Sequence, residues 1–289
     1  MTLTTRAQSP VKGGNSVAAV TSKSKKKFHL STLIFILCLA AGLCLLLYPT
    51  VSDLYNQYKA AQTIKNYKSQ MEKLPPQEAE KIWKQARKYN RDLAKRGQNM
   101  QLSKEEKRRY QKTLNPNGDG IMGYIVIRKL KENIPIYHGT SEKVLQIGSG
   151  HLDWTSLPVG GKDSLSVVSG HRGLPSARLF TDLDKIGKGD KVVLHVLNRT
   201  LTYQVDEIKI ILPTQPKSLY IRPGQDGLTL MTCTPYGVNT HRLLVHAHRV
   251  PNDALSKKDA SPSKKPVWIL VLAAAGTVFL LYLLRKRRD

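Results

Sequence analysis

Thr229-Leu230-Met231-Thr232-Cys233-Thr234 is a short β-prone run that ends at the one cysteine outside the long apolar segments of this chain. The other two cysteines, Cys38 and Cys44, lie inside an apolar stretch. A thiol with no disulfide partner, in a domain facing an oxidising exterior, is either a buried small hydrophobe or a nucleophile. A polar threonine–cysteine–threonine setting at a strand end is a poor core position, so the pattern favours a nucleophile.

The sequence around this run predicts a mainly β domain. Short segments rich in β-branched and apolar residues are separated by Gly and Pro turns, with brief helical pieces at 141–147 and 178–186. Many short strands of this kind are typical of a small barrel or sandwich rather than a doubly wound sheet. Pro135 places its strand at an edge or a bulge. The predicted strands are 124–127, 134–137, 164–169, 191–197, 202–212, 227–234 and 241–250.

A helical region precedes the strands, from residue 51 to residue 114. Pro75-Pro76 interrupts it, and Pro76 suits the first position of the next helix. Ser103 and Glu106 have capping-box spacing and predict the start of a short helix. The stretch 115–120 is dense in turn residues and marks the boundary to the strands. It faintly resembles a calcium loop, but the downstream glutamate is missing, so a plain turn is predicted.

Two apolar runs, 30–48 and 267–284, are each long enough to cross a bilayer as a helix, at ~1.5 Å per residue across ~30 Å of hydrocarbon. Lysines precede the first run and four basic residues, 285–288, follow the second. Basic residues beside spans favour the cytoplasmic side, so both termini are expected inside and the domain outside. The alternatives are a cleaved signal peptide for the first run, which lacks a clear cleavage site, and a buried core helix for the second.

These patterns predict a two-pass membrane protein whose parts follow one another along the 289 residues. The expected order is a basic cytoplasmic tail (1–29), a transmembrane helix (30–48), an extracellular helical region (49–114), a β domain (115–252), a linker (253–266), a second transmembrane helix (267–284) and a basic tail (285–289).

The formal net charge of +25 raises the question of nucleic-acid binding. Outside the tails, much of the positive charge lies in 59–112, where it is mixed with glutamates. No aromatic platform or basic recognition helix accompanies it, so a solvated helical face is expected rather than a nucleic-acid site. Attraction to an anionic envelope polymer or lipid surface stays open at this point.

Two further residues fit acyl-transfer chemistry with Cys233. His171 follows the apolar strand 164–169 at a turn, where an imidazole could protonate a leaving amine and later deprotonate an incoming one. Arg242 opens the last strand, and its fixed guanidinium could stabilise an oxyanion. Taken singly, a structural histidine or a surface arginine is the commoner outcome. His246 and His248 share a strand face without a third ligand nearby, so no metal site is predicted.

The motifs together resemble the sortases, the cysteine transpeptidases of Gram-positive cell surfaces. Thr229 to Cys233 matches the family's TLxTC signature, and His171 and Arg242 match its histidine and arginine. The stretches 115–124 and 232–242, and the C-terminal anchor, resemble class C, the pilus-assembling branch. The resemblance covers 115–250 strongly.

This resemblance implies an eight-stranded sortase-type β-barrel with short helices, flanked by the two membrane helices. It also implies that Cys233 attacks the threonine carbonyl of an LPxTG-like signal on a pilin precursor. Arg242 would support the oxyanion and His171 would protonate the departing glycine amine. A lysine of the next pilin would resolve the thioester as an isopeptide bond, with no cofactor. Thr232 is a candidate for contact with the peptide.

One departure from class C concerns the lid. Members of that branch typically carry an Asp-Pro-aromatic motif before the barrel, and no Asp-Pro pair occurs in 50–120. The lid is therefore expected to be absent or rebuilt, with Met100 or Leu102 as the plug, and the thiol to be more open.

Other functions use the same residues. A sortase could instead join surface proteins to a peptidoglycan amine, and water could resolve the same thioester in a hydrolase. A membrane-tethered pilus scaffold or adhesin, with Cys233 merely structural, is the reading from a different class.

Overall fold

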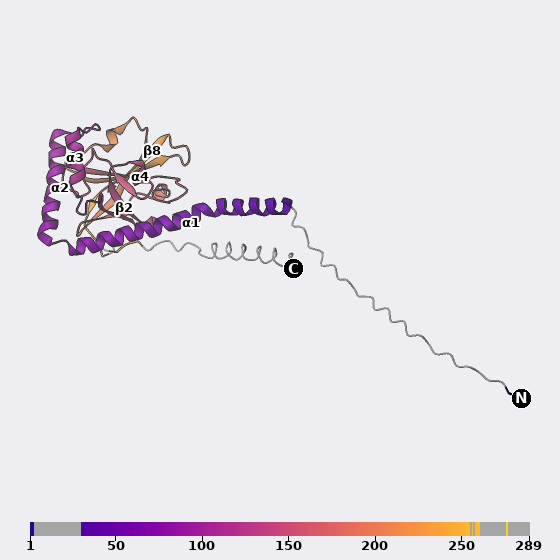
Figure 1. Ribbon diagram of the computed structural model, residues 1–289. Helices are drawn as coiled ribbons and strands as arrows, with labels where there is room; N and C mark the ends of the chain where they lie inside the picture. Colours follow the sequence, from indigo (N-terminus) through magenta and orange to yellow (C-terminus); the bar gives the residue numbers. More distant parts are fainter. Residues whose placement is uncertain (3–29, 255, 257, 261–275, 277–289) are drawn as a thin grey trace. The chain divides into compact units, whose positions relative to one another are not determined.

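The computed structural model describes residues 1–2, 30–254, 256, 258–260 and 276 (Figure 1). The chain divides into two compact units, residues 1–39 with 266–289, and residues 40–265. The second unit contains the sheet and most of the helical residues. The helices are α1 (Leu30–Lys73), α2 (Pro76–Arg96), α3 (Lys104–Lys112) and α4 (Glu142–Leu145). The strands are β1 (Ile121–Ile127), β2 (Glu132–His138), β3 (Ser149–His151), β4 (Ser164–Ser169), β5 (Lys191–Val196), β6 (Arg199–Ile211), β7 (Asp226–Thr234) and β8 (His241–Val250).

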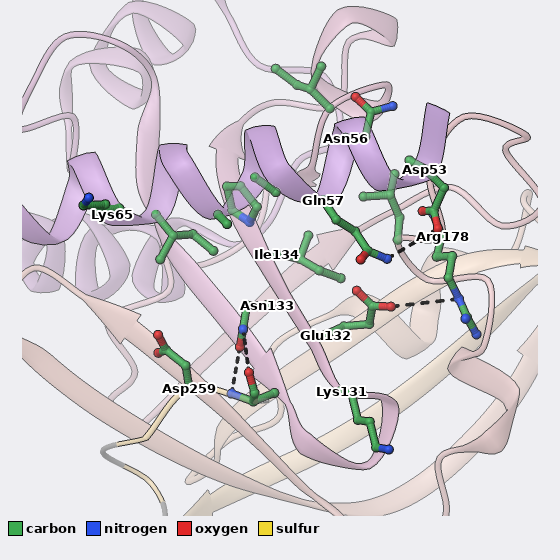
Figure 2. A pocket seen from close by; sticks show the side chains of 18 of the residues that line it. Asp53, Asn56, Gln57, Lys65, Lys131, Glu132, Asn133, Ile134, Arg178 and Asp259 are labelled. Atoms are coloured by element: carbon green, nitrogen blue, oxygen red, sulfur yellow. Dashed lines mark hydrogen bonds and ion pairs between the residues drawn. The ribbon is translucent and has the colours of Figure 1, made fainter. Parts of the chain in front are cut away.

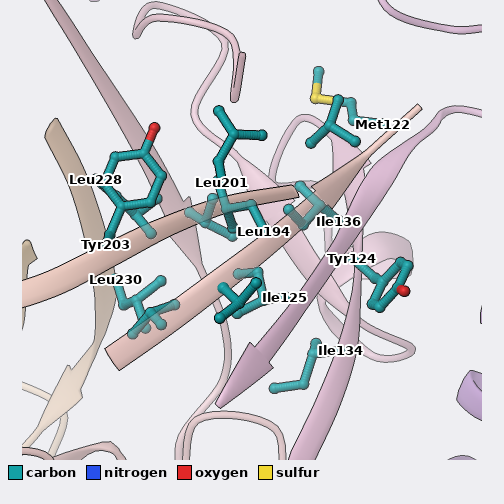
Figure 3. Close-up of a cluster of buried hydrophobic side chains, with 14 of the residues drawn as sticks. Met122, Tyr124, Ile125, Ile134, Ile136, Leu194, Leu201, Tyr203, Leu228 and Leu230 are labelled. Carbon is teal, nitrogen blue, oxygen red and sulfur yellow. The ribbon is translucent and has the colours of Figure 1, made fainter. Parts of the chain in front are cut away.

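The eight strands close into a barrel in the order β1-β2-β3-β4-β7-β8-β6-β5, which confirms the predicted eight-stranded β-barrel. The pairs β2–β3 and β4–β7 are parallel, and the other neighbours run antiparallel. Apolar side chains from different strands fill the interior, among them Ile125, Leu194 and Leu230 (Figure 3). Removing these side chains from water is the main force that holds the barrel closed.

Strands β4 and β7 are buried on both faces for much of their length. One face of each, including Val168 and Leu230, belongs to the interior cluster. The other face lies under a second apolar cluster, in which the alternate residues Val167 and, partly buried, Met231 take part. Because both faces are covered, apolar residues can stand next to each other along these strands, as Val167 and Val168 do on β4 and Leu230 and Met231 do on β7.

Two helices begin where the local sequence predicts, and side chains on α1 and α2 attach these helices to the barrel. Helix α2 begins at Pro76, and Ser103 and Glu106 form the predicted reciprocal capping box of α3. The side chain of Asn90 on α2 both accepts from the Leu157 amide and donates to the Leu157 carbonyl. On α1, the Tyr67 hydroxyl donates to the Met122 carbonyl and accepts from the Leu197 amide, which ties this helix to the barrel.

The structure differs from the sequence-based expectations at two strands. Strand β3 was not predicted, because three residues are too few to show a pattern. Strand β2 was expected at an edge or a bulge. It is not an edge strand, since it lies between β1 and β3, but its register with β1 shifts between Ile121 and Gly123. The reason lies in the register: β3 pairs with β2 only from Ile136 onward, so Pro135 has a strand partner on the β1 side alone. A proline, which has no amide hydrogen, is tolerated at such a locally unpaired position.

Helix α1 continues through residue 48 and Pro49 to Lys73, so the expected span boundary is not a helix end. Among the described residues, α1 is the one helix long and apolar enough to cross a membrane, with a mean hydropathy of 1.7 over its most apolar window. This finding fits a membrane-anchored protein. The tails, most of the predicted linker and the predicted second span at 267–284 lie outside the described residues, apart from Gly276.

Candidate active site

Cys233 lies one residue before the end of β7, directly opposite Arg242 at the start of β8. Side chains on directly paired residues of antiparallel strands project to the same face, with Cβ atoms about 4.5–5.5 Å apart. Register alone therefore places a guanidinium beside the thiol. Cys233 is half-buried and has no disulfide partner.

His171 reaches the same place through the parallel pairing of β4 and β7. Ser169 is the register partner of Met231, and the two chains stay together beyond that pair. The Gly170 amide donates to the Met231 carbonyl over 3.1 Å, and the Thr232 hydroxyl donates to the Gly170 carbonyl over 2.7 Å. His171 follows Gly170 on one strand as Cys233 follows Thr232 on the other. The structure thus brings all three predicted catalytic residues to one end of three adjacent strands.

Gly170 permits a close approach just before His171. A Cβ at this position would lie 2.8 Å from the Phe180 ring, so the ring packs directly on the glycine backbone. The Phe180 amide also donates to the His171 carbonyl over 3.1 Å. Phe180 is fully buried, and it therefore fixes the backbone that carries the imidazole.

One carboxylate faces the imidazole. Glu142, the first residue of α4, has an Oε1 atom 3.6 Å from Nε2 of His171, and its side chain is 70% exposed. A hydrogen bond from the side-chain amide of Gln146 lowers the pKa of Glu142, and the nearby His171 side chain lowers it further by a smaller amount. His171 Nε2 is buried and makes no hydrogen bond to another described residue. The charged group facing that nitrogen is the Glu142 carboxylate.

The arginines beside the thiol are held differently. Arg242 donates from Nη1 to the carbonyls of Asn239 and His241, each over 3.0 Å, so its own turn orients it. Arg172, whose side chain is 9% exposed, donates to the Thr234 hydroxyl over 3.1 Å and forms an ion pair with Asp184. Arg172 thus links the segment after His171 to the residue after Cys233. Sequence reasoning assigned no role to Arg172 or Glu142, because neither contact has a local sequence signal.

Thr232 is buried, and strand alternation directs its side chain to the face opposite Cys233. Its hydroxyl is used by Gly170, so it joins β7 to the segment after β4.

The two lid candidates have different surroundings. Met100 is 49% exposed, whereas Leu102 is 8% exposed in the second apolar cluster, against which Met231 also packs. Met231 lies two residues before Cys233 on the same strand face. The neighbouring Gln98 side chain accepts from the Ile221 amide and donates to the Leu219 carbonyl, so this segment is bound to the β6–β7 connection.

Helix α1 also contacts the loop that begins at His171. The side-chain amide of Asn56 donates to the Ser176 carbonyl over 2.7 Å. The Asp53 carboxylate accepts from the backbone N–H of Arg178 over 2.9 Å. A cavity of about 440 Å³ lies beside these contacts, between α1 and β2 (Figure 2). Burial raises the pKa of Glu132 in its wall to about 7, although Arg178 opposes this.

The described residues contain no group of three or more His, Cys, Asp or Glu side chains suited to a metal ion. The Cys233 end brings together a thiol, an imidazole and a guanidinium. Such a set can form and resolve an acyl-enzyme.

Comparison with known proteins agrees with this chemistry. Residues 125–250 match the family model of the sortase domain. The structure is similar to sortase C1 of Streptococcus agalactiae, with 47% identity and a TM-score of 0.65, covering 66% of this chain and 100% of that one. It is also similar to sortase C of Streptococcus pneumoniae, with 39% identity, a TM-score of 0.59 and coverage of 67% and 98%. A lid mutant of Corynebacterium diphtheriae sortase A has 38% identity and a TM-score of 0.59, covering 62% and 97%.

Curated relatives match over a smaller share of their length. Sortase A of Streptococcus agalactiae is 32% identical over 144 residues, which is 49% of this chain and 58% of that protein. Sortase D of Bacillus subtilis is 27% identical over 131 residues, 44% of this chain and 63% of that protein. The chain therefore spans less than two thirds of the length of these two relatives.

Proposed function

This chain belongs to the sortase family, in its class C branch, and we propose that it is a cysteine transpeptidase that joins pilin subunits. The supporting observation is the register of three strands, which sets Cys233 opposite Arg242 and beside the segment that carries His171. The similarity to sortase C proteins supports the pilin substrate.

In the first step, Cys233 Sγ attacks the threonine carbonyl carbon of an LPxTG-like sorting signal. A C–S bond forms, and the carbonyl oxygen becomes an oxyanion beside the Arg242 guanidinium. Collapse of the intermediate breaks the threonine–glycine C–N bond, and His171 gives its proton to the departing glycine amine. The product is a thioester between the sorting signal and Cys233.

In the second step, the Nζ amine of a lysine on the next pilin attacks the thioester carbonyl. His171 takes the proton from the incoming amine, the C–S bond breaks, and Cys233 leaves as thiolate. An isopeptide bond joins the two subunits. The half-buried setting of Cys233 favours aminolysis, because it limits the access of water to the thioester.

We assign the role of lid to Leu102 rather than Met100. Leu102 is buried in the cluster on the strand face that Cys233 shares, whereas Met100 is largely exposed. The two hydrogen bonds of Gln98 hold the segment in place without an Asp-Pro-aromatic motif. In this proposal a rebuilt lid at Leu102 lies beside the thiol, in place of the more open site expected from the sequence.

The N-terminal part of α1 anchors the protein in the membrane, with the barrel outside the cell. Asn56 and Asp53, near the middle of α1, bind the loop after His171, so the same helix that carries the anchor also contacts the catalytic end of the barrel.

The test supplies two amines in competition. The full-length protein in non-ionic detergent receives an LPxTG peptide with a pilin-type lysine peptide and a peptidoglycan-type amine at equal concentration, and products are identified by mass. Preferential transfer to the lysine peptide supports pilus assembly. Preferential transfer to the wall-type amine would indicate surface anchoring, the free acid alone a hydrolase, and no cleavage by the folded protein a scaffold.

A further inference from the structure

A basic groove lies at the end of the barrel opposite Cys233. Strand β7 begins at Asp226 in the wall of this groove and ends beside Cys233, and β8 runs from Arg242 to Arg249 in the groove. Seven residues of extended strand separate the two places, about 23 Å. The groove encloses about 560 Å³ between α2 and the barrel.

Five cationic side chains line the groove. Lys84, Arg87 and Arg91 lie at i, i+3 and i+7 on α2, so they share one helix face. Arg199, which opens β6, and Arg249, near the end of β8, face them from the barrel. Two carboxylates, Glu80 and Asp226, also line the groove, so cations exceed anions by three.

The two carboxylates of the groove bind other partners. Glu80 pairs with Arg199 and more distantly with Lys84. Asp226 uses one oxygen for the Tyr203 hydroxyl and the other for the Gly161 amide. No described carboxylate forms an ion pair with Arg87, Arg91 or Arg249.

Arg249 carries the strongest single observation. Its Nη1 atom is buried and has no hydrogen-bond partner among the described residues. A buried guanidinium nitrogen without an acceptor is costly, and a bound anion would supply the missing acceptor.

Arg87 packs against the backbone of Gly161. A Cβ on Gly161 would lie 2.6 Å from the Arg87 guanidinium carbon, so the guanidinium packs directly on this glycine. Gly161 also has a φ of +117°, which side-chain-bearing residues rarely adopt. The Arg87 guanidinium thus lies against the groove wall at Gly161.

The surroundings favour phosphates over an acidic peptide. The apolar lining residues Trp83, Val159 and Leu201 are all buried, so the groove offers no exposed apolar anchor. Protein partners usually depend on such anchors, whereas guanidinium forks match phosphate oxygens directly. The helical spacing of Arg87 and Arg91 places two such forks in a row.

We propose that this groove binds a phosphate-bearing polyanion along the face of α2, at the end of the barrel away from the catalytic cysteine. The ligand holds the enzyme to an anionic polymer while Cys233 stays free to react. This site goes beyond the transpeptidase activity and does not depend on it.

The test measures binding of end-labelled inorganic polyphosphate by fluorescence anisotropy. It uses the full-length protein in non-ionic detergent, in a background where the basic residues of 23–27 and 285–288 are replaced by Gln. We expect Arg87→Gln/Arg91→Gln to weaken binding by at least about tenfold, and added salt to weaken the parent strongly, as counterion release requires. Poly-glutamate of equal charge should bind at least about tenfold more weakly than polyphosphate.

The matched control is Arg108→Gln/Lys112→Gln, which removes two exposed charges from α3. It should stay within about twofold of the parent, and thermal unfolding confirms that both variants are folded. Equal losses of affinity in the two variants would mean that polyphosphate binds through the overall positive charge of the surface and not through the groove. Equal binding of poly-glutamate would indicate an acidic protein partner, and no binding of polyphosphate would overturn the proposal outright.

Discussion

The two ends of the barrel present arginines in opposite ways, although β8 supplies one to each. At the Cys233 end, Arg242 is fixed by direct strand pairing and by its own turn. At the groove end, Arg249 meets Arg87 and Arg91 only because α2 packs across the barrel. Strand register determines the first arrangement, whereas the second depends on the packing of elements that are distant in the sequence. The first suits a reaction that needs fixed geometry, and the second suits binding of a flexible polyanion.

The largest expected effect compares the two arginines of β8. Arg242→Gln should lower kcat/KM for transpeptidation by about 10²–10³, the usual loss when one oxyanion donor is removed. Arg249→Gln makes the same chemical change about 23 Å away and should leave kcat/KM within about threefold. Steady-state rates with an LPxTG peptide and a lysine acceptor measure both. Similar losses in the two variants would show that the ends are not functionally separate.

A second prediction concerns the Glu132 carboxyl group, which belongs neither to the Cys233 site nor to the basic groove. Burial raises the pKa of Glu132 to about 7, so the folded state keeps a proton that the unfolded chain releases near 4.5. Stability from this group is therefore greatest below pH 4.5 and declines as pH rises to 7. The gap between the two pKa values corresponds to about 3 kcal/mol.

Glu132→Gln should remove this decline, so that the variant gains stability over the parent between pH 5 and pH 8. Thermal unfolding of both proteins across that range measures the difference. The side chain is 13% exposed, so screening by solvent is small. A stability difference that does not change with pH would mean that Glu132 is already ionised in the folded protein.

The third prediction tests the cover over the thiol. Leu102→Ala removes a buried side chain from the cluster that Met231 joins, and labelling of Cys233 should accelerate by about tenfold at a cost of about 2–3 kcal/mol in stability. Mass mapping separates Cys233 from Cys38 and Cys44. Leu152→Ala, in the same cluster, controls for destabilisation, and Met100→Ala should change nothing. Equal acceleration in Leu152→Ala would remove the lid role.

The smallest effect is expected at Glu142. Its side chain is 70% exposed and lies 3.6 Å from His171, so solvent screens the pair. Glu142→Gln should change kcat/KM by no more than about threefold across pH 6–8. A loss as large as that of Arg242→Gln would make Glu142 a positioning residue for the imidazole.

Much of the barrel is readable from the sequence because its strands have local patterns. The predicted boundaries of 164–169 and 241–250 coincide with β4 and β8, and the Ser103 capping box forms as its spacing requires. Strand β3 escaped prediction because its three residues are defined only by their partners. Pro135 predicted an edge or a bulge, because the sequence does not show where β3 stops pairing with β2.

The site shows the same division. Cys233, His171 and Arg242 each lie within two residues of a strand end, so local signals single them out. Arg172 and Phe180 act through contacts across the fold, and the basic groove depends on packing of α2 against two distant strands. No local pattern reports such contacts. For the same reason, the sequence predicts a solvated helical face for the positive charge of 59–112, although part of this charge lines the groove.

The most direct test of the account is intact-mass analysis of the full-length protein in detergent after mixing with an LPxTG peptide and no amine acceptor. We expect a mass gain equal to the acyl half of the peptide, located at Cys233, lost on addition of a lysine peptide and absent in Cys233→Ala. If the folded Cys233→Ala variant cleaved the peptide as well as the parent protein does, Cys233 would not be the nucleophile. An acyl group found on another residue of the parent protein would contradict the assignment in the same way.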